Sequence, residues 1–146
     1  MNIQKNEIEF LVKELYKIDF FSKLSTEEVD TVLEKFYKHT FKKGATIVPQ
    51  GKPGRFFAVI FTGKVKVTLK QGFLRKKVLA ELEAGHYFGE ISLLSDEPTT
   101  ASIIASEKTE VFLLNRTDFK HILASNCQLA AKIRSIAENR LIEASF

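Results

Sequence analysis

Two neighbouring stretches decide how this chain is interpreted: Phe88-Gly89-Glu90-Ile91-Ser92-Leu93-Leu94 and, shortly after, Pro98-Thr99-Thr100-Ala101-Ser102-Ile103. Gly89 has no Cβ, so it can adopt a positive φ and allow close approach of other groups, although a tight turn alone would also explain it. Glu90 follows directly and suits the N-terminus of a short helix, where the helix dipole stabilises a carboxylate. The apolar residues of the first stretch are suited to a core, and Thr99 and Thr100 have the β-branched side chains typical of a strand entry.

Amphipathic helices precede this region. An apolar face with helical spacing predicts a first helix from about residue 6 to residue 18, formed by Ile8, Leu11, Val12 and Leu15. Ser25 and Glu28 have the spacing of a capping box, and the helical face repeats after them at Val29, Val32, Leu33 and Phe36. We therefore expect N-terminal helices over residues 1–39.

From residue 40 to residue 115 the pattern changes to that of strands. Residues 56–61 form a continuous apolar run of strand length, and residues 64–70 alternate between lysine or threonine and apolar side chains. Glycines recur at intervals typical of short strands joined by tight turns, with Gln71-Gly72 as a hairpin tip. About eight strands without helical patterns between them predict a β-sandwich, jelly roll or barrel.

Helical spacing returns over residues 116–146. Asn115 or Thr117 is a suitable cap for a short helix, and a terminal helix follows with an apolar stripe formed by Leu129, Ile133, Ile136, Ala137 and Leu141. The 146 residues suffice for one core, so we expect a single domain over residues 1–146 with no separate effector domain.

Composition excludes several classes of function. The histidines His39, His86 and His121 have no metal-ligand spacing, and Cys127 has no neighbouring base, so we expect neither an enzyme nor a metal or cofactor site. The net charge is +4, but the densest basic runs, Lys42-Lys43 and Arg75-Lys76-Lys77, are short. We interpret them as a solvated basic face rather than a nucleic-acid footprint.

The order of motifs resembles the cyclic-nucleotide-binding domain family, which includes catabolite activator proteins, protein kinase A regulatory subunits and cyclic-nucleotide-gated channels. The two opening stretches resemble its phosphate-binding cassette, and residues 47–54 and 56–67 resemble its early strands around a Gln-Gly turn. The resemblance extends from about Phe20 to Leu123. It implies a mainly β fold, an eight-stranded β-roll or jelly roll with N-terminal and C-terminal helices.

The resemblance also implies a ligand site. The expected ligand is cAMP or cGMP, with a cyclic dinucleotide as a further option, and Glu90 would accept a hydrogen bond from the ribose 2′-hydroxyl. Leu79 and Leu82 would contact the base, although a core role explains them equally well. The implied set of ligand-binding residues is Phe88, Gly89, Glu90, Ile91, Ser92, Thr99, Thr100, Ala101, Leu79 and Leu82.

Two departures from the family pattern stand out. Thr99 occupies the position where most nucleotide-binding members have an arginine, which would clamp the phosphate with two charge-assisted hydrogen bonds. Arg55 stands where an acidic or small polar residue is common, and it is either exposed to solvent or adds positive charge near the roll.

Two functions remain open on this basis. The first is a regulatory module that senses a cyclic nucleotide and signals through the C-terminal helix to a protein effector. The second is a degenerate member that has lost cAMP and cGMP binding and serves protein interaction or dimerisation. The apolar stripe of the terminal helix would form either a homodimer seam or a lid over the ligand.

Three features that the sequence lacks lead to expectations about partners and cellular location. The chain stops at Phe146, after the terminal helix, where a helix-turn-helix would have to follow, so we expect no DNA-binding domain. No apolar run approaches the ~18 residues that span a bilayer, and we expect no membrane partner. A single cysteine cannot form an internal disulfide, so we expect a cytoplasmic protein in which Cys127 is at least half-buried.

Overall fold

The protein is a β-roll with helices before and after it in the chain. A computed structural model describes residues 2–73 and 75–144, except for the side chains of Phe20 and of residues 137–144. The strands are β1 (Tyr37–Phe41), β2 (Thr46–Val48), β3 (Phe56–Thr62), β4 (Lys64–Gln71), β5 (Arg75–Glu83), β6 (Tyr87–Phe88), β7 (Ser102–Ala105) and β8 (Thr109–Asn115). The helices are α1 (Lys5–Tyr16), α2 (Asp19–Ser22), α3 (Thr26–Leu33), the 3₁₀ helix η1 (Glu90–Leu93), α4 (Arg116–Ser125) and α5 (Cys127–Ala144).

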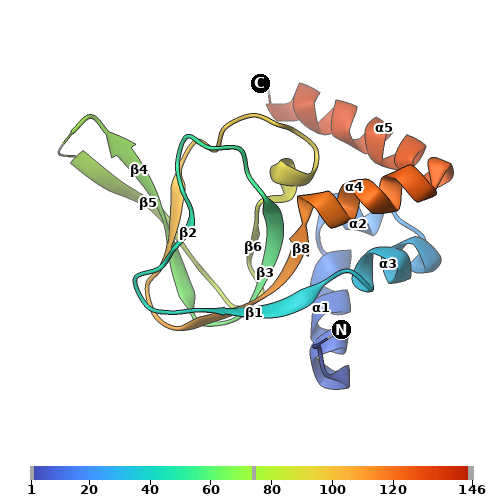
Figure 1. Cartoon of the computed structure of the whole chain (residues 1–146), viewed down its shortest axis with the longest axis horizontal. Helices are drawn as coiled ribbons and strands as arrows, with labels where there is room; N and C mark the ends of the chain where they lie inside the picture. Colours follow the sequence, from blue (N-terminus) through green and yellow to red (C-terminus); the bar gives the residue numbers. More distant parts are fainter. Residues whose placement is uncertain (1, 74, 145–146) are drawn as a thin grey trace.

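The strands form two antiparallel sheets of four strands each, in the orders β1-β8-β3-β6 and β2-β7-β4-β5. Strands β4 and β5 form a long hairpin that leaves the body of the roll (Figure 1). Gly72 follows β4 with a φ of +71°, so the expected hairpin tip is confirmed. These two sheets with flanking helices confirm the eight-stranded β-roll expected from the sequence.

The continuous apolar run of β3 results from burial on both faces of its sheet. Phe57 and Val59 belong to the cluster beneath the helices, whereas Ala58 and Ile60 belong to the cluster inside the roll. Strand β8 alternates between the same two clusters. Successive residues of a strand point to opposite faces, so a strand covered on both sides needs an unbroken apolar sequence.

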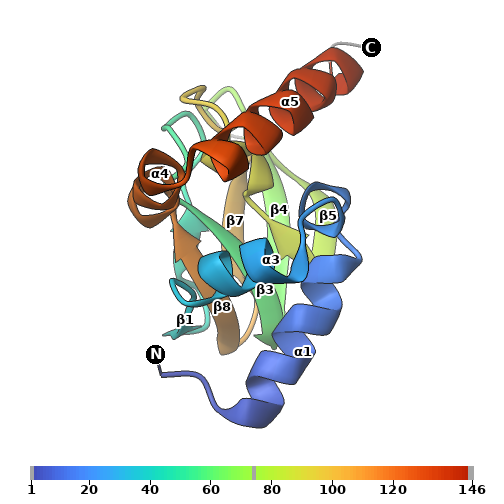
Figure 2. The same cartoon turned by 90° about the vertical axis from the view of Figure 1, so that its right-hand side faces the viewer.

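The helices lie together against the outer face of the β1-β8-β3-β6 sheet (Figures 1 and 2). Leu11 and Leu15 of α1 are fully buried there. The capping box at the start of α3 is formed as expected, with Glu28 N–H donating to Ser25 Oγ and Ser25 N–H donating to Glu28 Oε1. The amphipathic pattern of the sequence therefore produces the packed layer directly.

The terminal helix packs its apolar stripe against its own chain. Leu129, Ile133 and Ile136 are all buried in the cluster beneath the helices. The side chains of Ala137 and Leu141 lie outside the described residues. The described part of the stripe is thus covered within one chain and does not present a free seam to a second copy.

Some expectations need correction. Strand β1 begins at Tyr37, before the expected boundary at residue 40, and the short helix α2 was not expected. The first helix ends at Tyr16, because residues 17–18 form a turn before α2 begins at Asp19. Cys127 is exposed at the start of α5, because the first turn of that helix presents it to solvent while Leu129 is the residue that faces the core.

Candidate functional site

The backbone conformation of Gly89 positions the start of η1 in the candidate site. Its φ is +86°, in the left-handed region, and it is the N-cap of η1. A Cβ at this position would lie 2.4 Å from the carbonyl oxygen of Phe56 on the neighbouring strand β3. Both the conformation and the close approach exclude a side chain here. The turn and the approach of the β3 backbone are thus sufficient to require glycine at residue 89, and its contact with a ligand stays a prediction.

The residues after Gly89 differ in burial. Leu93 is buried beneath the helices, whereas Ile91 is 57% exposed and Ser92 is half-buried. Glu90 is half-buried, and no hydrogen bond or ion pair joins its side chain to another described residue. As the first residue of η1 it lies where backbone N–H groups lack partners within the helix. Its carboxylate is therefore available to a ligand.

Phe88 serves the core of the roll. It is 6% exposed, belongs to the cluster inside the roll, and meets the ring of Phe56 edge-on at 6.4 Å between centroids. The short pairing of β6 with β3 places Phe88 opposite Ala58. Phe88 thus anchors the start of the turn at Gly89, and its ring packs in the core of the roll.

The polar groups of Thr99 are all engaged in local hydrogen bonds. Its hydroxyl donates to the carbonyl of Pro49 at 2.7 Å. Its N–H donates to the carbonyl of Lys52 at 2.9 Å, and its own carbonyl accepts from the N–H of Gly51 at 2.9 Å. Thr99 therefore fastens the second stretch to the turn at residues 49–52, and its one hydroxyl proton is already used.

Other contacts extend this connection. Pro98 forms a bridge with Pro53, and the N–H of Gln50 donates to Ser102 Oγ at 2.9 Å. The side chain of Gln50 accepts from the N–H of Lys70 at 2.9 Å and donates to the carbonyl of the same residue at 3.4 Å. The Gln-Gly turn noted in the sequence thus joins the second stretch to the β4–β5 hairpin close to its tip.

The remaining expected site residues are distributed around these two stretches. Thr100 is exposed and Ala101 is half-buried before β7. Leu82 is half-buried against the cluster inside the roll, opposite Val65. Leu79 is 50% exposed, and it has no partner in β4 because the register passes from Ala80 to Val78, which makes it the extra residue of a bulge.

Two arginines lie at the junction of the first stretch with α4. Arg55 is exposed to solvent, directly before β3, and its carbonyl accepts from the N–H of Arg116 at 2.8 Å. The Arg116 guanidinium forms an ion pair with Asp96, just after η1. Sequence reasoning missed this link, since the two residues are 20 positions apart and carry no spacing signal.

The clearest electrostatic shifts lie in the helical layer. The Lys38 ammonium lies 2.5 Å from Glu7 Oε2 and 3.0 Å from Glu110 Oε2. Hydrogen bonds from Lys38 lower the pKa of both carboxyls, and the same bonds raise the pKa of Lys38. The hydrogen bond from Lys132 lowers the pKa of Glu28 in the same way. These groups join helices to each other and to the roll.

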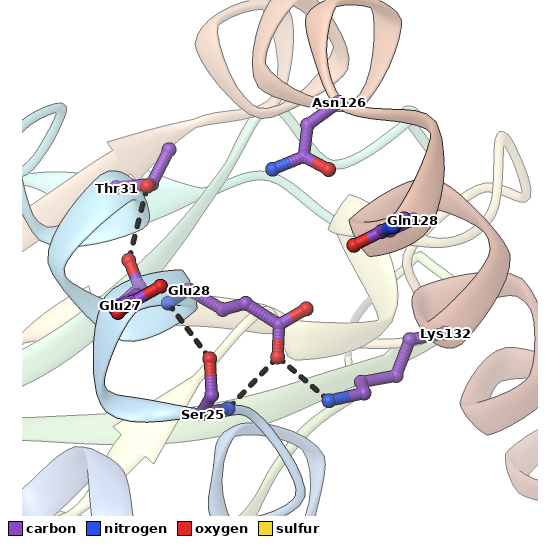
Figure 3. A pocket seen from close by; sticks show the side chains of 7 residues that line it. All are labelled: Ser25, Glu27, Glu28, Thr31, Asn126, Gln128 and Lys132. Carbon is purple, nitrogen blue, oxygen red and sulfur yellow. Dashed lines mark hydrogen bonds and ion pairs between the residues drawn. The ribbon is translucent and has the colours of Figure 1, made fainter.

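Two hollows are described on the surface. One of about 440 Å³ lies between the residue 49–51 turn and the β4–β5 hairpin. The other, of about 430 Å³, lies between α3 and the junction of α4 with α5, where Glu28 and Lys132 meet (Figure 3). Within residues 2–73 and 75–144, no three His, Cys, Asp or Glu side chains come together to hold a metal ion. None of the described helices has the length and hydropathy needed to cross a bilayer.

Comparison with known proteins decides the family. The profile described as "Cyclic nucleotide-binding domain" matches residues 38–126. This stretch covers more than half of the chain and contains Gly89, Glu90 and Thr99. The chain belongs to the cyclic nucleotide-binding domain family. The resemblance drawn from the motif order is therefore confirmed.

Individual members of the family are similar over most of the chain. The cyclic AMP receptor protein of Thermus thermophilus is 32% identical over 126 residues, covering 86% of this chain and 58% of that protein. A structure of cAMP-bound PfPKA-R superimposes with a TM-score of 0.77 at 25% identity, covering 84% of this chain and 43% of that one.

A cyclic nucleotide-binding domain from Methylobacillus flagellatus gives a TM-score of 0.74 at 27% identity, covering 97% of this chain and 79% of that domain. This chain spans less than two thirds of the Thermus relative and of PfPKA-R. The similarity therefore establishes the domain, and activities of the longer proteins stay proposals for this chain.

Proposed function

We propose that this cyclic nucleotide-binding domain is a regulatory module that binds cAMP or cGMP beside η1 and signals through α4 and α5. The observation that carries the proposal is the half-buried carboxylate of Glu90, which has no partner among the described residues and follows directly after the left-handed Gly89. A carboxylate at this place is free to accept a hydrogen bond from a ligand, and a ribose 2′-hydroxyl supplies a donor. The relatives support the ligand class, since one binds cyclic AMP by name.

The proposed site has two parts. Gly89, Glu90, Ile91 and Ser92 face the cyclic phosphate and the ribose, while Thr100 and Ala101 border the phosphate from the second stretch. Leu82 and Leu79 contribute apolar surface on the side of the base, and the exposed fraction of Leu79 leaves it free to contact a ligand. Phe88 and Thr99 hold the two stretches in place.

The proposed route to the effector runs through contacts at both ends of the helical layer. The ion pair of Arg116 with Asp96 joins the segment after η1 to the first residue of α4. The ion pair of Lys132 with Glu28 joins α5 to α3. A ligand that shifts η1 would change the first contact directly, and a protein effector would recognise the resulting position of α5. We place the protein in the cytoplasm, because its single cysteine is typical of a reducing compartment.

The test is a calorimetric titration with cAMP, cGMP and cyclic dinucleotides, supported by thermal unfolding. Free ligand at 100 times its dissociation constant should add about 2.7 kcal/mol of stability. Glu90→Gln should weaken binding of the 2′-hydroxyl nucleotide and leave the 2′-deoxy analogue nearly unaffected. Equal losses for the two sugars would show that Glu90 serves the fold and not the ligand.

A second function is favoured by one specific observation. The hydroxyl of Thr99 is committed to Pro49, and no basic side chain takes the place of the missing arginine among the expected site residues. A domain without a phosphate clamp fits a degenerate member that serves protein interaction or dimerisation. Dimerisation through α5 would not use Leu129, Ile133 and Ile136, since these residues are buried within the chain. No binding of any cyclic nucleotide at millimolar concentration would favour this function.

A further inference from the structure

The β4–β5 hairpin concentrates the positive charge of the chain. Residues 64–83, the two strands and their turn, contain six lysines and arginines and two glutamates, a net charge of +4. The net charge of the whole chain is also +4, so the residues outside the hairpin are together neutral. The antiparallel pairing places Lys70 opposite Lys76, beside the run Arg75-Lys76-Lys77, whereas Lys66 and Lys64 lie opposite Glu81 and Glu83.

The register distributes these charges around both faces of the hairpin. Lys70 lies directly opposite Lys76, so these two side chains share one face. Arg75 and Lys77 lie opposite Gln71 and Leu69, on the other face. Like charges directly opposite each other destabilise an isolated hairpin. None of the ion pairs between described residues involves these four side chains, so their charge remains uncompensated.

The tip of the hairpin combines this charge with bare apolar surface. Phe73 at the tip is 100% exposed, and Val78 and Leu79, further along β5, are 52% and 50% exposed. Strand β4 last pairs with β7 at Thr68, so the hairpin beyond this point has two strands only and projects from the roll (Figure 1). Gln50 binds the hairpin close to this tip, through two hydrogen bonds to the backbone of Lys70. These bonds hold the tip in place.

We propose that the β4–β5 hairpin binds the surface of an anionic lipid bilayer, with Phe73 entering the headgroup region and the basic side chains contacting lipid phosphates. An exposed aromatic ring at a convex extremity, surrounded by lysine and arginine, has the two components of peripheral membrane binding. A single-stranded nucleic acid instead requires a basic groove with successive stacking platforms, and the hairpin offers one protruding ring. This proposal revises the expectation of no membrane partner, which rested on the lack of a spanning segment.

Vesicle co-sedimentation of the full chain, without nucleotide, tests whether the basic side chains of the hairpin bind anionic lipid. The vesicles are phosphatidylcholine alone, or phosphatidylcholine with about a third phosphatidylserine. We expect binding to the anionic vesicles only, with release when salt rises from about 0.1 M to about 1 M and the Debye length shrinks from about 10 Å to about 3 Å. Each basic side chain near an anionic surface strengthens binding about fivefold, so K76E/K77E should weaken it at least about twentyfold.

The matched control is K42E/K43E, which makes the same charge change in the exposed turn between β1 and β2. It should retain most of the binding. Equal losses for the two double variants would overturn the proposal, because binding would then follow net charge. Failure of the full chain to bind anionic vesicles, or binding of single-stranded nucleic acid in their place, would also overturn it.

Insertion of the tip is tested by fluorescence. The chain has no tryptophan, so Phe73→Trp introduces a single reporter. Its emission should move to shorter wavelength on addition of anionic vesicles, while Tyr16→Trp, at a partly exposed site of α1, should not change. Phe73→Ser should weaken vesicle binding about tenfold through the lost apolar contact. An unshifted emission of Phe73→Trp on bound protein would overturn insertion. Nucleotide binding does not enter these measurements, so the proposal stands or fails separately from the sensing function.

Discussion

The Lys132 ammonium donates a hydrogen bond of 2.6 Å to the same oxygen of Glu28 that accepts the N–H of Ser25, 2.8 Å away (Figure 3). One carboxylate therefore caps α3 and at the same time holds α5, whose lysine lies 104 positions later in the chain. Any movement of α5 away from α3 must break this ion pair. Its strength is thus part of the energy that holds the terminal helix against α3.

Removal of the lysine should measure this energy. The side chain of Lys132 is 41% exposed, so Lys132→Met should lower the free energy of unfolding by only about 0.5–1 kcal/mol at neutral pH. Urea denaturation gives the value. Lys23→Met is the control, because its pair with Asp19 is longer, at 3.7 Å, and joins two residues of one chain segment. A larger loss for the control would contradict the role of the interhelical pair.

The difference between the wild type and Lys132→Met should depend on pH. Hydrogen bonds from Lys132 and Ser25 lower the pKa of Glu28 from the ordinary 4.5. A lowered carboxyl pKa contributes stability above the unfolded value, and the contribution disappears as pH falls through the folded value. Denaturation at neutral pH and at about pH 3 should therefore show a smaller difference in acid than at neutral pH. An undiminished difference in acid would contradict an electrostatic origin.

A second prediction concerns the buried pair of Glu7 with Lys38. Glu7 is 4% exposed, and Lys38 retains Glu110 as a second partner when Glu7 is changed. Glu7→Gln should therefore cost about 1–3 kcal/mol of unfolding free energy, measured by urea denaturation at neutral pH. The surface variant Asp19→Asn, which loses an ion pair with the exposed Lys23, should cost less. Similar losses would contradict the importance of burial.

The sequence predicts the helical layer and the roll well because both depend on local periodicity. Burial of β3 on both faces requires its unbroken apolar run, and the Ser25 capping box reports the start of α3 from four adjacent residues. The helix α2 has no such signal, since four residues are too few to show a period.

Contacts of the site with distant segments could not be predicted in the same way. The bond from Thr99 to Pro49 joins residues 50 positions apart and depends on how the roll closes. The identity of Thr99 indicates a missing arginine, but only the structure shows that its hydroxyl is already used. The pairing of Arg116 with Asp96 likewise depends on where α4 begins relative to η1.

The turn at Gly89 gives a third prediction. Gly89→Ala should destabilise the fold by more than Gly72→Ala, although both glycines have a positive φ of +86° and +71°. An added Cβ at Gly89 meets the Phe56 carbonyl at 2.4 Å, whereas nothing lies within 4 Å of one at Gly72. We expect about 1 kcal/mol for the conformation alone at Gly72 and at least about twice that at Gly89. Thermal and urea denaturation compare the two, and equal losses would contradict the close approach.

The last prediction restores the missing clamp. Thr99→Arg should raise the affinity for cAMP or cGMP at least about tenfold, because a guanidinium makes charge-assisted hydrogen bonds with a phosphate. The substitution also removes the hydroxyl bond to Pro49, which costs about 0.5–1.5 kcal/mol of stability. Thr99→Gln is therefore the proper reference, since it loses the same bond and gains a long neutral side chain. Calorimetry at low and high salt isolates the contribution of the arginine's charge, because only the arginine variant should lose affinity steeply with salt. If Thr99→Arg folds as stably as Thr99→Gln and binds no cyclic nucleotide at millimolar concentration, the space beside Glu90 does not admit a phosphate. The domain would then act through its surfaces alone.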